Sequence, residues 1–309
     1  MHRPLLSMTA RGTRLALLVG AMVVSATAAR RAEARSGPGD PVASISDSLR
    51  GRSGRLRFRI VRPGAGAESE IETLNRLFGP DALGRPGLLA VRDSLTDESF
   101  NFANLIPFTD KQNGRVGVYR VGRWPGEVRR PRSEAYRLPQ GFIEVNAEAL
   151  DVQVSTHFRI GQFLTHDQRD VWPKILVLDE RLVDKLELII SELRLAGHRA
   201  EGLTVLSGFR TPQYNARGKN SGRATDSRHQ YGDASDVFVD ANGDGRMDDL
   251  NHDGRSDIRD ASVFSKIVDR VEAKYPELTG GVGVYRSTPG HGPFVHVDAR
   301  GERARWGFP

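Results

Sequence analysis

The chain has 309 residues, of which 38% are apolar and 27% charged, and its formal net charge is +6. This composition is that of a soluble globular protein with one good core or two modest ones. The absence of cysteine excludes disulfides, a lipidated cysteine and thiolate chemistry, so any metal must be held by histidine and carboxylate. The sequence has no nucleic-acid-binding motif, and its small positive charge suits an anionic cell wall.

The first residues predict an export signal. Arg3, Arg11 and Arg14 precede an apolar run over residues 15–24, and Ala26-Thr27-Ala28 follows. A basic start, a short apolar run and an A-x-A site are typical of a secretory signal peptide. The run is shorter than the ~20 residues of a membrane span, and an uncleaved anchor is the alternative. We therefore expect a signal peptide over 1–28, no stable membrane span after its removal, and a periplasmic or secreted protein.

The next part of the chain predicts a linker and a small module. Residues 29–54 are rich in Arg, Ser, Gly and Pro without apolar periodicity, which indicates a flexible linker. Strict alternation over 56–60 predicts a half-buried strand, and 116–121 and 142–145 predict further strands. Gly- and Pro-containing loops separate them. We interpret residues 55–150 as a β-rich module of unknown role without recognisable chemistry.

Helical and strand patterns alternate in the last half of the chain. Residues 179–196 have the apolar stripe of a core-facing helix, and Gly197 is a suitable stop. A second stripe covers 262–274. Short strands are expected over 203–206, 281–285 and 294–297. These patterns predict an α+β fold, with a small antiparallel sheet and flanking helices in residues 151–309.

Three residues of this half have the composition of a catalytic zinc site. His229 and Asp236, in H-x6-D spacing, flank a Gly-containing turn, and Asp236 opens an apolar strand. His296 lies in a strand whose period of two places Asp298 on the same face. Two imidazoles and one carboxylate, with a fourth position open to water, are typical of catalytic zinc. Such a zinc ion activates water and polarises a carbonyl without a covalent nucleophile.

The segments around these residues resemble a known family. Residues 227–236 have the pattern S-x-H-x-x-G-x-A-x-D, and residues 207–215 have S-G-F-R-T-x-x-x-N. Both are similar to signature segments of the zinc D-alanyl-D-alanine carboxypeptidase and endopeptidase family, whose fold is shared with the hedgehog signalling domain. The similarity covers residues 154–307. It implies that His229, Asp236 and His296 hold zinc, and that Arg210 binds the substrate carboxylate or the developing oxyanion.

The sequence departs from that family at one position. A Glu or Asp often lies three residues before the last ligand and serves as general base, whereas this chain has Pro293. His291 matches a second active-site histidine of some members. We expect His291 to transfer the proton or stabilise the oxyanion, with Asp298 or Asp233 as fallback bases. A loop position without a role is the alternative for His291.

An acidic insertion over residues 240–260 lies between the metal ligands. It contains two copies of D-x-N-x-D-G-x-x-D. Oxygen side chains at positions 1, 3, 5 and 9, with glycine at 6, are typical of a calcium loop, for one ion or two. A solvated acidic turn is the alternative. The candidate calcium ligands are Asp240, Asn242, Asp244, Asp248, Asp249, Asn251, Asp253, Asp257 and Asp260.

Three functions follow from these patterns. The first is an exported zinc peptidase that hydrolyses peptidoglycan stem peptides, either trimming or cutting cross-links. The second is a zinc-binding wall or scaffold protein without catalysis, which Pro293 permits. The third is a calcium-stabilised surface adhesion module. Peptidoglycan or another cell-wall peptide is the expected partner in the first case.

Overall fold

The computed structural model describes residues 32–36, 47–61, 68–80, 82–93, 97–218 and 223–308. The expected signal peptide lies outside the described residues. The helices are α1 (Glu68–Phe78), α2 (Glu180–Leu195), α3 (Pro212–Arg217) and α4 (Ile258–Lys274). The strands are β1 (Ala32–Ser36), β2 (Phe58–Ile60), β3 (Gly87–Asp93), β4 (Ser99–Asn104), β5 (Ile106–Pro107), β6 (Arg115–Val116), β7 (Tyr119–Arg120), β8 (Gly141–Val145), β9 (Lys174–Leu176), β10 (Thr204–Ser207), β11 (Ala234–Phe238), β12 (Gly281–Tyr285), β13 (Phe294–Asp298) and β14 (Ala304–Trp306).

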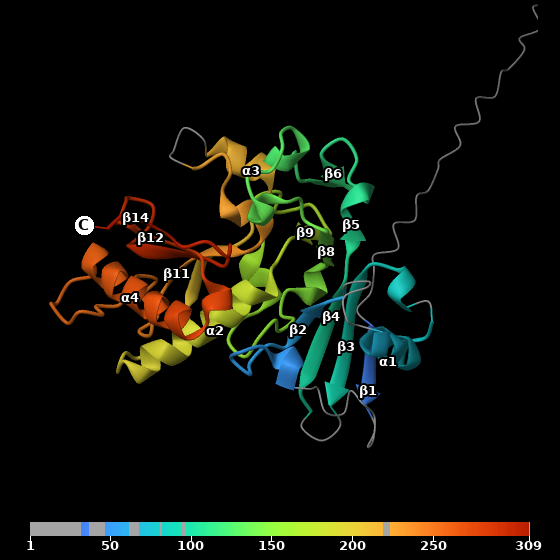
Figure 1. Ribbon diagram of the computed structural model, residues 1–309, viewed down its shortest axis with the longest axis horizontal. Coiled ribbons are helices and arrows are strands. Elements are labelled where there is room, and N and C mark those ends of the chain that lie inside the picture. Colours follow the sequence, from blue (N-terminus) through green and yellow to red (C-terminus); the bar gives the residue numbers. More distant parts are fainter. Residues whose placement is uncertain are drawn as a thin grey trace, which may run out of the picture.

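A five-stranded sheet with the order β10-β11-β13-β12-β14 forms one end of the molecule. Neighbouring strands are antiparallel except β12 and β14, which are parallel. Helix α4 packs on β12 and β13 and lies beside α2 (Figure 1). This mixture of helices and mainly antiparallel strands confirms the predicted α+β class.

Helix α2 forms where the apolar stripe predicted it. The side chain of Asp179 accepts a hydrogen bond from the backbone N–H of Arg181, which satisfies one of the donors that a helix start leaves open. Leu186 and Ile189 of the stripe are fully buried, and burial of each such side chain contributes about 1.5–3 kcal/mol. Gly197 follows the helix with a φ of 87°, a left-handed conformation that glycine adopts readily.

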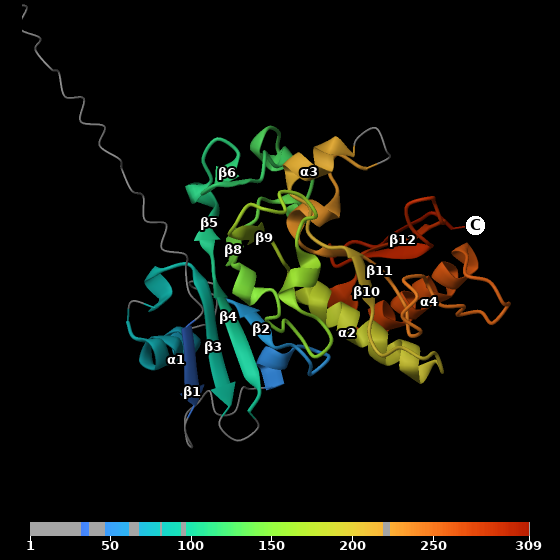
Figure 2. The same cartoon turned by 180° about the vertical axis from the view of Figure 1, so that it is seen from behind.

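A second sheet lies at the opposite end of the molecule (Figures 1 and 2). It has four strands in the order β1-β3-β4-β2, and α1 packs beside β1. A small apolar core that includes Leu74, Phe100 and Phe102 holds this part together. The interpretation of residues 55–150 as β-rich therefore missed one helix, α1.

Two features of the expected domain organisation differ from the structure. Within the predicted linker, residues 29–54, β1 pairs in parallel with β3, and Asp47–Arg50 form a 3-10 helix. The predicted boundary at residue 150 does not divide the core, because β8 pairs with β9 across it and one apolar core runs from Leu56 to Val297. Both differences come from pairing between distant segments, which local composition does not show.

Smaller differences concern single elements. The strand predicted over 116–121 is a hairpin of β6 and β7, with Gly117 at a φ of 54° in the turn between them. The strands predicted over 281–285 and 294–297 correspond to β12 and β13. No helix in the described part of the chain is long and apolar enough to cross a membrane.

Candidate metal centre

Two neighbouring strands and one short helix bring the three predicted ligands together. Asp236 on β11 lies directly opposite His296 on β13 in the antiparallel register. Side chains at directly opposite positions share one face of the sheet, with Cβ atoms about 4.5–5.5 Å apart. His229 comes from a 3-10 helix, Arg228–Tyr231, that precedes β11. All three side chains are buried, and they form a group that could hold a metal ion.

One atom of each ligand lies at a corner of a nearly regular triangle. The Nε2 atom of His229 lies 3.1 Å from Nδ1 of His296 and 3.2 Å from Oδ1 of Asp236. The third side, from Nδ1 of His296 to Oδ1 of Asp236, is 3.0 Å. A tetrahedral zinc with bonds of about 2.0–2.1 Å has ligand–ligand edges of about 3.3 Å. The triangle therefore matches one face of such a tetrahedron.

Hydrogen bonds at the outer nitrogens orient both imidazoles. Nδ1 of His229 lies 2.6 Å from the carbonyl oxygen of Gly208, and Nε2 of His296 lies 3.1 Å from Oδ2 of Asp298. A neutral imidazole has one N–H, so these contacts leave lone pairs on the two inner nitrogens. Two lone pairs and a carboxylate oxygen then face each other, an arrangement that a cation stabilises.

Gly208 has a steric role in this orientation. A Cβ atom at this position would lie 2.6 Å from the Cα atom of Phe163, which is closer than packed atoms approach. Only glycine lets the chain pass Phe163 at this distance. The carbonyl of Gly208 can therefore reach the imidazole of His229.

The charges of the cluster favour the metal-binding forms of two of its residues, His229 and Asp236. Burial lowers the pKa of His229 to about 4. Burial acts to raise the pKa of Asp236, but the imidazoles of His229 and His296 and the guanidinium of Arg210 hold it well below its usual range. At neutral pH Asp236 is therefore ionised and His229 is neutral, as metal ligands must be.

Arg210 lies beside the ligands, as the resemblance implied. Its guanidinium donates to Oδ2 of Asp236 and, through Nε at 2.8 Å, to the hydroxyl of Ser207. Its backbone N–H donates to the carbonyl oxygen of His229 at 3.0 Å. The two bonds of the side chain use only part of the five N–H donors of the guanidinium.

Asp298 lies behind His296, on the side away from the triangle. Oδ1 accepts from the backbone N–H of Gly281 at 2.7 Å, and both oxygens accept from the guanidinium of Arg300. With Oδ2 also at Nε2 of His296, every oxygen of this buried carboxylate has a partner. Asp298 therefore orients a ligand, and the structure does not place it in the position of a base.

The other two residues predicted to move protons lie outside the triangle as well. Asp233 is buried in an ion pair with Arg228. Nδ1 of His291 lies 2.8 Å from the carbonyl oxygen of Gly292, and its ring packs edge-on against Phe294 with centroids 4.9 Å apart. In the described part of the chain, no contact joins His291 to a member of the triangle.

Two aromatic residues that the sequence patterns did not single out form a wall beside the ligands. The ring of Trp306 lies 5.2 Å from that of His296, and its Nε1 donates to the hydroxyl of Tyr285 at 2.9 Å. A Cβ atom at Gly283 would lie 2.3 Å from the indole, so this glycine provides the space. The repeated glycines of Gly281 and Gly283 are the signal in the sequence, because glycine inside a strand often marks a close approach.

The predicted calcium ligands are not gathered into a metal group. Within the described ranges, only His229, Asp236 and His296 form a group of three acidic or imidazole ligands. Both carboxylate oxygens of Asp260 accept backbone N–H groups, one of them from Asp257, in the capping box of α4. Asp240 and Asp249 each accept two backbone N–H groups within their own loops. Calcium binding stays a prediction.

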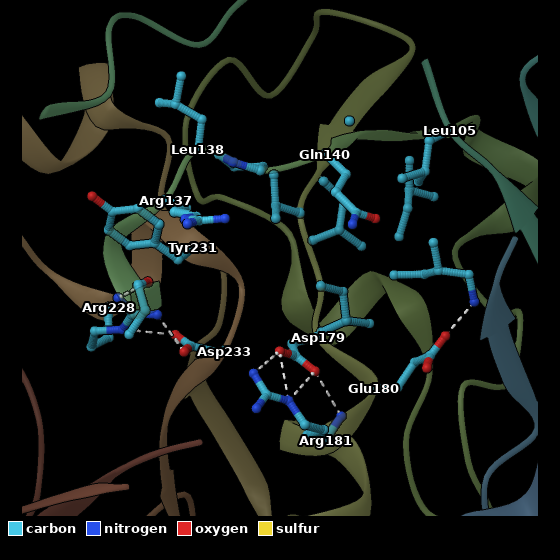
Figure 3. A pocket seen from close by; sticks show the side chains of 18 of the residues that line it. Leu105, Arg137, Leu138, Gln140, Asp179, Glu180, Arg181, Arg228, Tyr231 and Asp233 are labelled. Atoms are coloured by element: carbon cyan, nitrogen blue, oxygen red, sulfur yellow. Dashed lines mark hydrogen bonds and ion pairs between the residues drawn. The ribbon is translucent and has the colours of Figure 1, made fainter. Parts of the chain in front are cut away.

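A cavity of about 430 Å³ between β9, the start of α2 and residues 134–141 contains none of the three ligands (Figure 3). The charged side chains that line it form ion pairs with each other, Asp179 with Arg181 and Asp233 with Arg228. The ring of Tyr231 forms part of one wall, and its hydroxyl points away from the middle of the cavity. Because its charges are satisfied, this cavity does not compete with the triangle as a functional site.

Comparisons of the chain with protein-family models, curated proteins and solved structures found no match. The geometry of the metal centre is therefore the basis for assigning a function.

Proposed function

We propose that the protein is an exported zinc peptidase that hydrolyses peptide bonds in peptidoglycan stem peptides. The observation that carries the proposal is the buried triangle of His229, Asp236 and His296 with Arg210 beside it. Two imidazoles and one carboxylate, with edges of 3.0–3.2 Å, suit zinc in its four-coordinate form. The motifs around these residues, which resemble those of D-alanyl-D-alanine peptidases, support the choice of substrate.

The donor set is what a catalytic zinc site requires. Zinc held by three such ligands lowers the pKa of a bound water and polarises a substrate carbonyl. The contacts from Gly208 and Asp298 fix which imidazole nitrogens face the metal. Residues behind the ligands commonly contribute to affinity in this way.

Two side chains of the wall are suited to act on the substrate. Arg210 is held in place by Ser207 and Asp236, and its remaining N–H groups can bind a carboxylate or an oxyanion. Tyr285 accepts a hydrogen bond from Trp306, so its own O–H can donate to a substrate oxygen. Burial raises the pKa of Tyr285, and Asp236 and Arg210 lie close enough to act on it. The family often has an acidic residue at the position of Pro293. In this chain Tyr285 serves as the hydrogen-bond donor to the substrate instead.

Digestion of purified muropeptides, with products read by mass spectrometry, tests this proposal. We expect loss of a terminal residue or cutting of a cross-link by protein containing about one equivalent of zinc. His229→Ala should lose both the zinc and the activity. Full zinc content without turnover on any wall fragment would refute a peptidase.

A zinc-binding protein without catalysis is the second candidate. It is favoured by Pro293, which replaces the family's acidic base, and by His291, whose Nδ1 is bonded to Gly292. Retention on insoluble peptidoglycan without release of products would favour this candidate.

Replacing Asp298 with asparagine is expected to weaken metal affinity by about 10- to 100-fold. The carboxylate behind His296 makes the imidazole a stronger ligand, and an amide cannot supply that negative charge. Competition with a chromophoric zinc chelator measures the change. Glu302→Gln, an exposed position nearby in sequence, is the control. Equal affinities of the two variants would show that Asp298 does not support the ligand.

A further inference from the structure

Two cavities lie along one arginine-rich segment on the side of the molecule that carries α3. One, of about 250 Å³, is lined by parts of residues 125–136 together with Asp226 and Tyr231. The other, of about 400 Å³, is lined by parts of residues 113–123 together with Gln213. Their linings contain a single acid, Asp226, and six arginines, which we name the arginine surface: Arg115, Arg120, Arg123, Arg129, Arg130 and Arg132.

The smaller cavity has buried polar atoms that lack a partner. Tyr231 is 8% exposed, and its buried hydroxyl has no hydrogen-bond partner among the described residues. Tyr231 lines the smaller cavity as well as the one in Figure 3, where its hydroxyl points away from the middle of that cavity. Oδ1 of Asp226 likewise has no partner in the described ranges. An unpaired buried polar group is destabilising, and a ligand that bonds to it would offset this cost.

The arginines around these atoms differ in whether their side chains already form ion pairs or hydrogen bonds within the protein. Arg129 pairs with Oδ2 of Asp226. Arg132 donates to the hydroxyl of Tyr136 and lies over its ring at 3.9 Å. No ion pair or hydrogen bond engages the side chains of Arg123 and Arg130 within the described part of the chain. A guanidinium has a planar fork of donors that matches carboxylate and phosphate.

We propose that the arginine surface binds an acidic peptide. Carboxylates of the peptide pair with Arg123 and Arg130, and one of its N–H groups donates to Oδ1 of Asp226. A phosphate polymer supplies acceptors only and would leave Asp226 without a partner, whereas a peptide has both carboxylates and N–H donors. The ligand therefore belongs to the class of peptides with several carboxylates.

This surface lies near the metal centre. Asp226 precedes His229 by three residues, which span at most about 11 Å. A peptide held on the arginine surface is therefore within reach of the metal ligands. The identification of its natural ligand as a carboxylate-bearing stem peptide rests on the proposed function, whereas the binding of acidic peptide does not.

Fluorescence anisotropy with the full metal-bound protein tests the proposal. The probe is a labelled octapeptide of alternating Glu and Gly, and the same peptide with Gln for Glu is its control. We expect the Glu peptide to bind at least about tenfold more tightly, since hydrogen bonds between guanidinium and carboxylate are stronger than those between guanidinium and a neutral amide. Equal binding of the two peptides would overturn the proposal, as would tighter binding of inorganic polyphosphate of similar charge.

Matched variants locate the site. Arg123→Gln with Arg130→Gln should weaken binding of the Glu peptide by at least about tenfold. Arg85→Gln with Arg255→Gln changes the net charge equally at exposed positions elsewhere and should change affinity by less than about twofold. Tyr231→Phe should weaken binding without lowering the melting temperature, because the hydroxyl it removes has no partner in the described ranges. Equal losses in the two double variants would refute the site.

The outcomes separate this inference from the proposed function. His229→Ala should still bind the Glu peptide, because binding does not use the metal. Peptide binding without muropeptide turnover would refute the peptidase alone. Turnover whose KM is unchanged by Arg123→Gln with Arg130→Gln would refute the inference alone.

Discussion

Lys185→Ala is expected to lower the free energy of unfolding by about 3–5 kcal/mol. Lys185 is fully buried in α2. Its ammonium donates at 2.7 Å to Oε1 of Glu272 in α4 and at 2.7 Å to the carbonyl oxygen of Asp298 in β13. Alanine would remove a cation from a buried carboxylate and leave a cavity between two helices and the sheet. Urea unfolding measures the change.

Lys274→Ala is the matched control for this substitution. Lys274 also pairs with a carboxylate, that of Glu192, but its side chain is 52% exposed. Water and salt screen exposed pairs, which contribute about 0.2–1 kcal/mol. A loss in Lys185→Ala no larger than that in Lys274→Ala would contradict a stabilising role for the buried pair. Because Lys185 anchors the residue that orients His296, Lys185→Ala should also weaken metal affinity.

Removal of the metal is expected to lower the melting temperature by about 8–16 °C. A ligand present at a thousand times its Kd stabilises the folded state by about 4.1 kcal/mol, and each kcal/mol changes Tm by roughly 2–4 °C in a protein of this size. The physical cause is electrostatic repulsion. Nε2 of His229 and Nδ1 of His296 lie 3.1 Å apart, and without a cation their lone pairs face each other and the carboxylate of Asp236. Calorimetry with a chelator, followed by return of zinc, measures the shift.

His229→Ala serves as the control for metal removal, because this variant should melt at one temperature with or without chelator. The shift should also depend on pH. Burial lowers the pKa of His296, but contacts with Asp236 and Asp298 raise it above its ordinary value. A proton therefore competes with the metal for His296, so the stabilisation is complete above this raised pKa and is lost as the pH falls through it. A wild-type Tm that does not respond to chelator at neutral pH would contradict the metal centre.

Local sequence patterns were sufficient to predict the helices and strands around the metal centre. The stripe over residues 179–196 predicted α2 to within one residue at each end, because helix periodicity, the Asp179 cap and Gly197 agree. The short strands expected over 281–285 and 294–297 likewise correspond to β12 and β13. The N-terminal part was predicted less well, because β1 is held by β3, more than fifty residues further along the chain. No local pattern contains that pairing.

The residues that could hold the metal were predicted from spacing and residue type, and the structure gathers all three. The roles of their neighbours were not. Asp298 was predicted on the correct face of its strand, but a period of two does not tell whether a carboxylate lies before or behind an imidazole. Trp306 and Tyr285 carry no motif, and Trp306 contacts His296 and Tyr285 only because β14 pairs with β12.

The sequence by itself therefore determined the α+β class, the elements around the centre and the identities of His229, Asp236 and His296. Residue type, spacing and periodicity are local properties, and these conclusions depend on nothing else. The tertiary structure alone decided which nitrogen of each imidazole faces the middle of the triangle and that Asp298 contacts His296 from outside it. It also revealed that the buried hydroxyl of Tyr231 has no hydrogen-bond partner among the described residues. Those properties depend on distances and hydrogen bonds between strands and loops far apart in the chain, which exist only after the sheets have paired.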